Sequence, residues 1–214
     1  MTRADFLVGE ANRAAIALID RWPEWPDRPV LVAGPAGAGK THLVEIWRHA
    51  NGAAVHAADR LGDIEAMVAA GAVAVEALHA GPVDEAGLFH LINRAAERRV
   101  PLLMTSRLPA TALPVRLPDL ASRLRAAQPV AVGAPDDDLL RLVLVKLFAD
   151  RQLSVDPAIV EAIVTRMERS LEAAGRIVAE LDREALAEGR PITRRLVAAA
   201  LDRVIDGQPD LFDD

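Results

Sequence analysis

Eight residues, GPAGAGKT at positions 34–41, constrain the fold of this 214-residue chain more than any other stretch. They fit the pattern G-x-x-x-x-G-K-[ST] in full, follow the apolar run VLVA (30–33) and open a helical pattern. Glycines let such a loop curl so that backbone N–H groups point at phosphates, while the lysine reaches the β- and γ-phosphates and the hydroxyl holds Mg²⁺. The stretch predicts a phosphate-binding loop between a strand and a helix, made of Gly34, Pro35, Gly37, Gly39, Lys40 and Thr41.

Residues 1–133 alternate short apolar runs with longer helical patterns, as parallel strands joined by helices do. The predicted strands are VLVA (30–33), AAVH (53–56), VAVE (73–76), LLMT (102–105) and VAV (130–132). The predicted helices cover 13–20, 40–49, 61–70, 85–98 and 119–126. This order predicts an α/β nucleotide-binding domain with a doubly wound, five-stranded parallel sheet.

The apolar period changes to i, i+3, i+4, i+7 after GAPDDD (133–138), and it continues without a strand pattern. We therefore expect a second, helical part over 134–206 that contains four helices. We expect residues 207–214 to form a flexible tail, with Leu211 and Phe212 between aspartates and out of reach of a core.

Composition narrows the function classes. The formal net charge of −6 argues against a protein that grips phosphate backbones, and aromatic residues are only 3%, so we expect no direct sequence-specific binding of nucleic acid. The absence of cysteine excludes disulfides and thiolate chemistry. Since no apolar run is long enough to cross a bilayer, we expect no membrane association and a cytoplasmic location.

Hydrolysis requires more than the loop, because one carboxylate must serve the metal and another must polarise the attacking water. The strand VAVE ends in Glu76, which can serve Mg²⁺, but Ala77 follows and the next acid is Asp84. The pattern supports nucleotide binding and predicts weak or no intrinsic hydrolysis. At the end of the next strand, Thr105 and Ser106 could sense the γ-phosphate or could only cap a turn.

Together these motifs resemble the AAA+ ATPases, and more closely their DnaA/Hda group. The resemblance covers about residues 5–204 and includes DFLVGEANRAA (5–15), GPAGAGKTHL (34–43) and DEAGLFHLINRA (84–95). Three further stretches resemble the alphaproteobacterial Hda-type members: LPDLASRL (117–124), PDDDLLRLVLVKLFADRQL (135–153) and RMERS (166–170). The fold that this implies is an AAA+ core followed by a four-helix lid.

The resemblance also implies roles for single residues. Val8 and Asn12 would border the adenine, His42 would extend the loop motif, and Thr105 would act as the sensor. Arg123 would reach into the nucleotide of a neighbouring subunit; alternatively it is an ordinary arginine on a helix surface.

The lid arginine of the family is harder to place, because Glu172 holds the expected position. Arg169 and Arg176 lie one turn to either side, and we select Arg176 as the nucleotide contact. Glu172 and Arg176 at i, i+4 could instead form a surface pair.

The function implied by the resemblance is regulatory. A protein similar to Hda holds ADP or ATP with Mg²⁺, meets ATP-loaded DnaA and, with the DNA-loaded sliding clamp of DNA polymerase III, stimulates hydrolysis of the ATP on DnaA. Homo-oligomers are a further possibility. No helix-turn-helix pattern follows the helical part, so we do not expect an initiator. The alternatives are a self-sufficient AAA+ ATPase of the helicase-loader type, which would need a base such as Asp84, and a DNA-binding module built on the arginines of 94–125.

The end of the chain carries a candidate tether. QPDLF (208–212) resembles the bacterial clamp-binding pentapeptide, in which Gln208 would anchor by hydrogen bonds while Leu211 and Phe212 fill an apolar pocket. Members of the group usually carry a Q-L-x-L-type peptide at the N-terminus, where this sequence has only MTRA before Asp5. We therefore expect the tail to replace it.

Overall fold

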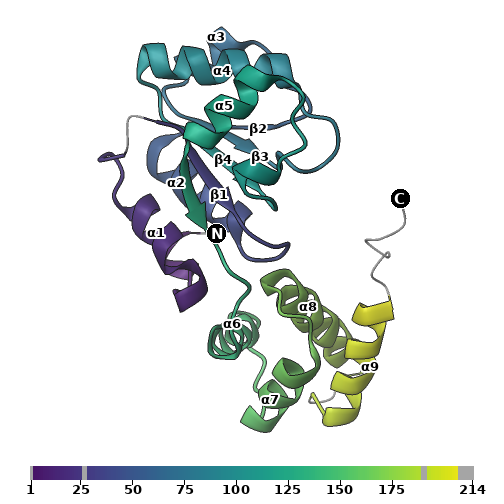
Figure 1. The fold of residues 1–214 in the computed structure, drawn as a ribbon. Helices are drawn as coiled ribbons and strands as arrows, with labels where there is room; N and C mark the ends of the chain where they lie inside the picture. Colours follow the sequence, from purple (N-terminus) through teal and green to yellow (C-terminus); the bar gives the residue numbers. More distant parts are fainter. Residues whose placement is uncertain (1, 26–27, 189–191, 207–214) are drawn as a thin grey trace. The chain divides into compact units, whose positions relative to one another are not determined.

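The computed structural model describes residues 2–25, 28–188 and 192–206 (Figure 1). The chain divides into two compact units, Met1–Gly133 and Ala134–Asp214, which are described separately below. None of the helices in the described ranges is both long and apolar enough to span a membrane.

The first unit is the predicted α/β domain. Its five strands form one parallel sheet in the order β2-β3-β4-β1-β5, which confirms the predicted fold class. The strands are β1 (Val30–Ala33), β2 (Ala54–Ala57), β3 (Val73–Glu76), β4 (Leu102–Ser106) and β5 (Gln128–Ala131). The helices are α1 (Arg13–Asp20), α2 (Lys40–Asn51), α3 (Ile64–Ala69), α4 (Glu85–Arg98) and α5 (Pro118–Ala126).

Strand β1 lies between β4 and β5, so the strand order reverses there. In open α/β sheets, ligands bind beyond the carboxyl ends of the strands at such a reversal. The register pairs Val32 with Thr105 and Ala33 with Ser106, so the ends of β1 and β4 lie side by side.

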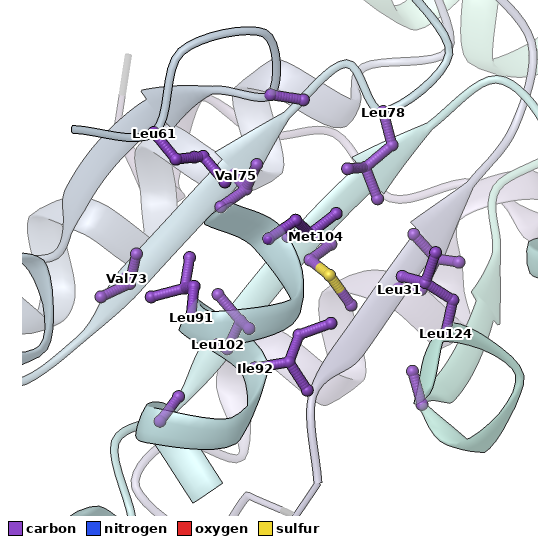
Figure 2. Close-up of a cluster of buried hydrophobic side chains, with 14 of the residues drawn as sticks. Leu31, Leu61, Val73, Val75, Leu78, Leu91, Ile92, Leu102, Met104 and Leu124 are labelled. Carbon is purple, nitrogen blue, oxygen red and sulfur yellow. The ribbon is translucent and has the colours of Figure 1, made fainter. Parts of the chain in front are cut away.

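The sheet separates two apolar cores, because alternate strand residues point to opposite faces. On one face, α3, α4 and α5 cover strand residues such as Val75 and Met104 (Figure 2). On the other face, α1 and α2 cover Val32, Ala74 and Leu103. Both faces are therefore buried, which explains the nearly continuous apolar runs of the strands.

Some predicted boundaries were wrong, for local reasons. Helix α3 begins at Ile64 rather than near residue 61, because Asp63 caps it by accepting hydrogen bonds from the N–H groups of Glu65 and Ala66. Strand β5 begins at Gln128, two residues earlier than predicted, and contains Pro129. A proline is tolerated there because β5 is an edge strand.

The second unit is helical in its described residues: α6 (Asp137–Asp150), α7 (Pro157–Arg166), α8 (Leu171–Glu188) and α9 (Arg194–Asp206). The side chains of Asp136 and Asp156 cap α6 and α7 by accepting backbone N–H bonds, each at 2.8 Å. The four helices share an apolar core that includes Leu144, Ile163 and Val178.

Candidate nucleotide-binding site

The loop between β1 and α2 has the backbone that its glycines permit. Gly37 and Gly39 adopt positive φ angles of 64° and 91°, which glycine accepts without steric cost. Gly34 is required for a different reason, because an added Cβ would lie 2.1 Å from the carbonyl oxygen of Val132. The loop is therefore fixed both by its own turns and by the end of β5.

Lys40 opens helix α2 and its ammonium group turns back into the loop. The Nζ atom donates hydrogen bonds to the carbonyl oxygens of Gly34 and Pro35, at 2.8 and 2.7 Å. Burial lowers the pKa of Lys40 and the positive charge of Arg107 lowers it further, while the carboxylate of Glu76 partly offsets both. An anion bound here would relieve this unfavourable charge, and the N-terminal N–H groups of α2 favour the same ligand.

Among the residues that the structure describes, Glu76 is the one acidic side chain of the site. Glu76 ends β3 and is half-buried, and its charge acts on Lys40. The described residues contain no group of three or more metal-ligating side chains. Mg²⁺ usually keeps several waters and takes one or two carboxylates plus phosphate oxygens, so Thr41 and Glu76 fit a nucleotide-dependent metal site.

The end of β4 is fastened to the loop that follows β3. Thr105 is buried, and its Oγ1 accepts a hydrogen bond from the backbone N–H of Ala77 at 3.1 Å. Ser106 is also buried, and its Oγ accepts from the N–H of Leu108 at 2.9 Å, as expected of a turn residue. The hydroxyl group of Thr105 can still donate its own hydrogen to a ligand. The role of Thr105 as a phosphate sensor remains a prediction.

Two residues near the loop were missed by sequence reasoning. His79 accepts a hydrogen bond at Nδ1 from the backbone N–H of Arg107, at 3.0 Å. Burial lowers the pKa of His79, and the charges of Arg107 and Lys40 lower it further. Both residues therefore belong to the same electrostatic environment as Lys40. No motif marks them, because they meet only through the pairing of β3 with β4.

Comparison with known proteins identifies the fold that contains this site. No protein-family model and no curated protein matches the sequence. Among solved structures, domain III of the replication initiation protein DnaA from Thermotoga maritima matches with a TM-score of 0.77 and 15% identity, over 95% of this chain and 96% of that one. The chain has the DnaA-like AAA+ fold.

Two further structures agree with this assignment. DnaA from Aquifex aeolicus, bound to AMPPCP, matches with a TM-score of 0.63 and 16% identity, over 94% of this chain and 87% of that chain. The RuvB Holliday junction branch migration motor of Thermotoga maritima matches with a TM-score of 0.66 and 17% identity, over 90% of this chain and 66% of that chain.

The N-terminal segment of the AAA+ fold lies against the start of α2 and the end of β5. The ring of Phe6 packs edge-on against His42 with centroids 5.0 Å apart, and the N–H of Gly133 donates to the carbonyl of Ala11 at 2.9 Å. Val8 is 42% exposed and could border a base.

Asn12, in contrast, is 1% exposed. Its side-chain amide connects two parts of this segment, because it accepts a hydrogen bond from the N–H of Gly9 and donates one to the carbonyl of Leu7. Asn12 therefore braces the segment, and its predicted contact with the adenine remains a prediction.

Asp84 has a structural task. It caps α4, and its Oδ1 accepts from the N–H of Gly87 at 2.9 Å. Its backbone N–H donates to the carbonyl of Ala58, just beyond the edge strand β2, which is three places from β1 in the sheet. Asp84 is therefore poorly placed to replace the missing second acid.

Arg123 lies on the exposed side of α5, whose buried side is formed by Leu120 and Leu124. The start of α5 is held by Glu85, whose carboxylate accepts hydrogen bonds from the N–H groups of Arg116 and Leu117. These bonds lower the pKa of Glu85. Arg123 is accessible to a partner, and its role in trans remains a prediction.

The lid candidates belong to the second unit, so their role at the nucleotide also remains a prediction. Arg169 pairs with Asp137 at 3.0 Å, whereas Arg176 lies 4.0 Å from Glu168 at the edge of ion-pair distance. Gln208, Leu211 and Phe212 lie outside the described residues.

Proposed function

We propose that this chain is a nucleotide-bound regulator of replication initiation of the Hda type. It holds ADP or ATP with Mg²⁺ and, together with the DNA-loaded sliding clamp of DNA polymerase III, stimulates hydrolysis of ATP held by DnaA. In this proposal Arg123 is the arginine donated to the nucleotide of DnaA, and the tail from Gln208 to Phe212 binds the clamp.

One observation carries the proposal. The phosphate-binding loop is complete, while β3 offers a single carboxylate, Glu76, followed by Ala77. Asp84 is engaged in capping α4. A site that binds nucleotide without its own base for water suits a protein that acts on the ATP of a partner. An arginine supplied in trans can accelerate such a hydrolysis by about a thousandfold or more.

The direct test is reconstitution. Clamp loaded on DNA, this protein and DnaA carrying labelled ATP are mixed, and conversion to ADP is followed. Arg123→Ala should abolish the stimulation while nucleotide and clamp binding stay intact. Arg125→Ala, which removes another exposed charge two residues along α5, is the matched control and should retain stimulation. Full stimulation by Arg123→Ala would refute the role of Arg123.

The tether is tested separately. Replacing both Leu211 and Phe212 with Ala should abolish clamp binding, because these side chains would fill the apolar pocket. Asp213→Asn changes the same tail without removing an apolar group and should still bind. Clamp binding by the double variant at wild-type affinity would remove the tail from the proposal.

A further inference from the structure

Arg107 leaves β4 at the edge of the phosphate-binding loop. The register pairs Ser106, the last residue of β4, with Ala33 of β1, and the carbonyl of Ser106 accepts the N–H of Gly34 at 3.1 Å. Gly34 in turn accepts a hydrogen bond from Lys40 Nζ. Arg107 therefore follows directly after a residue that is bonded to the loop.

The backbone of Arg107 is held in this place by the loop after β3. Its N–H donates to His79 Nδ1 at 3.0 Å, and the N–H of Leu78 donates to the carbonyl of Thr105 at 3.0 Å. The bond from the N–H of Ala77 to Thr105 Oγ1 completes the connection. Since Arg107 is exposed, its side chain is free to meet a ligand at this edge.

The charges at this edge are unbalanced. The charges of Arg107 and Lys40 both act on His79, and the charge of Arg107 also acts on Lys40. Among the described residues, Glu76 is the one carboxylate whose charge acts on Lys40. In the described part of the chain, no carboxylate forms an ion pair with Arg107. Two cations facing one carboxylate suit a multiply charged anion, and a guanidinium group can bind phosphate oxygens in a bidentate manner.

We propose that Arg107 is a phosphate-binding residue that contacts the terminal phosphate of a bound nucleoside triphosphate beside Lys40, with His79 as its positioning residue. This inference rests on the nucleotide binding in the proposed function and deepens it. The loop and the start of α2 hold the inner phosphates, whereas Arg107 stands at the end of β4, next to the Glu76 side of the site. The contact should therefore favour a triphosphate over a diphosphate.

The test is calorimetric binding of ATP and of ADP, each with Mg²⁺, to the full-length chain without DnaA or clamp. Arg107→Ala should weaken ATP binding by about 10- to 100-fold, the range for a hydrogen bond to a charged group. The factor by which the same substitution weakens ADP binding should be at least five times smaller than the factor for ATP. Arg107→Lys should recover part of the loss, since it keeps the charge. Arg60→Ala is the matched control, because Arg60 is exposed at the same sheet edge beyond β2, and should bind as wild type.

The positioning role is tested by His79→Ala, alone and combined with Arg107→Ala. If His79 acts through Arg107, the double variant should bind ATP no more weakly than Arg107→Ala. Additive losses would remove His79 from the inference. A smaller preference than fivefold, or wild-type ATP binding by Arg107→Ala, would overturn the role of Arg107 while leaving the proposed function standing. Failure of the wild-type chain to bind either nucleotide would instead refute the nucleotide-bound regulator.

Discussion

The ends of β1 and β3 lie at the same edge of one sheet, but they are equipped very differently. After β1, glycines at positive φ, a half-buried lysine and a helix N-terminus provide every part that an anion site needs. After β3, one carboxylate is followed by an alanine whose φ is 62°. Under the proposed function, the two tasks of such a site, holding a nucleotide and splitting it, are separated, and only the first is equipped in this chain.

The two strand ends also differ in the strain of their backbone conformations. Positive φ costs nothing at Gly37 or Gly39, but it costs about 1 kcal/mol at a residue with a Cβ such as Ala77. Ala77 is held in this conformation by the hydrogen bond from its N–H to Thr105. The backbone conformation after β3 therefore depends on the hydrogen bond to β4, whereas the positive φ angles after β1 are adopted by glycines.

The largest effect on nucleotide binding should come from a substitution in the phosphate-binding loop after β1. Lys40→Ala removes the ammonium group that would contact the phosphates of a bound nucleotide and should weaken nucleotide binding by about 100-fold or more, measured by calorimetry. The matched control is Lys146→Ala, which removes a lysine on α6 that pairs with Asp150. Binding by Lys40→Ala within threefold of wild type would contradict the assignment of the loop.

A second carboxylate can be added after β3, where Glu76 is followed by Ala77. Ala77→Asp places a second acid next to Glu76, at a φ that aspartate tolerates, and should raise intrinsic ATP turnover by about tenfold or more. Phosphate release under steady-state conditions measures this. Ala77→Asn has nearly the same shape without the charge and should show no increase; equal turnover of both variants would count against the missing acid as the cause.

Backbone strain at the β3 end can be measured by itself. Ala77→Gly should raise the free energy of unfolding by about 0.5–1 kcal/mol, because glycine adopts positive φ freely. Gly52→Ala is the reciprocal control: its φ is 73°, no atom lies within 4 Å of an added Cβ, and it should lose a similar amount. Urea denaturation of both variants is the measurement. An unchanged Ala77→Gly would show that the strand end carries no strain.

The smallest expected effect is a pH dependence from His79. Its pKa is lowered in the folded state, so the folded chain binds fewer protons here than the unfolded chain. The resulting stability is fully present above the ordinary histidine pKa of about 6.5 and is lost as the pH falls below it. His79→Gln should flatten the stability profile, measured by urea denaturation, between about pH 7.5 and 5.5. A profile of His79→Gln identical to wild type would contradict this assignment.

The sequence predicted the loop and the sheet because each of these signals is local. Glycine spacing determines the loop, and the apolar runs determine the strands. The start of α3 was missed because Asp63 forms capping bonds within its own turn. The start of β5 was missed because Pro129 is tolerated only at the edge of the sheet, and the strand order decides which strand lies there. His79 and Arg107 could not be found this way, because 28 residues separate them and only the strand order brings them together. The bracing role of Asn12 likewise depends on the folded path of its own segment.

We propose that the chain binds nucleotide at a site that does not hydrolyse it efficiently, and ATP turnover by the purified protein tests this directly. Phosphate release by the purified full-length protein is followed at saturating ATP and Mg²⁺, with occupancy of the site verified by calorimetry on the same sample. We predict an occupied site with turnover far below about one per second, the lower end of ordinary enzyme rates. An occupied site that turns over at about one per second or faster would contradict the account and identify a self-sufficient ATPase.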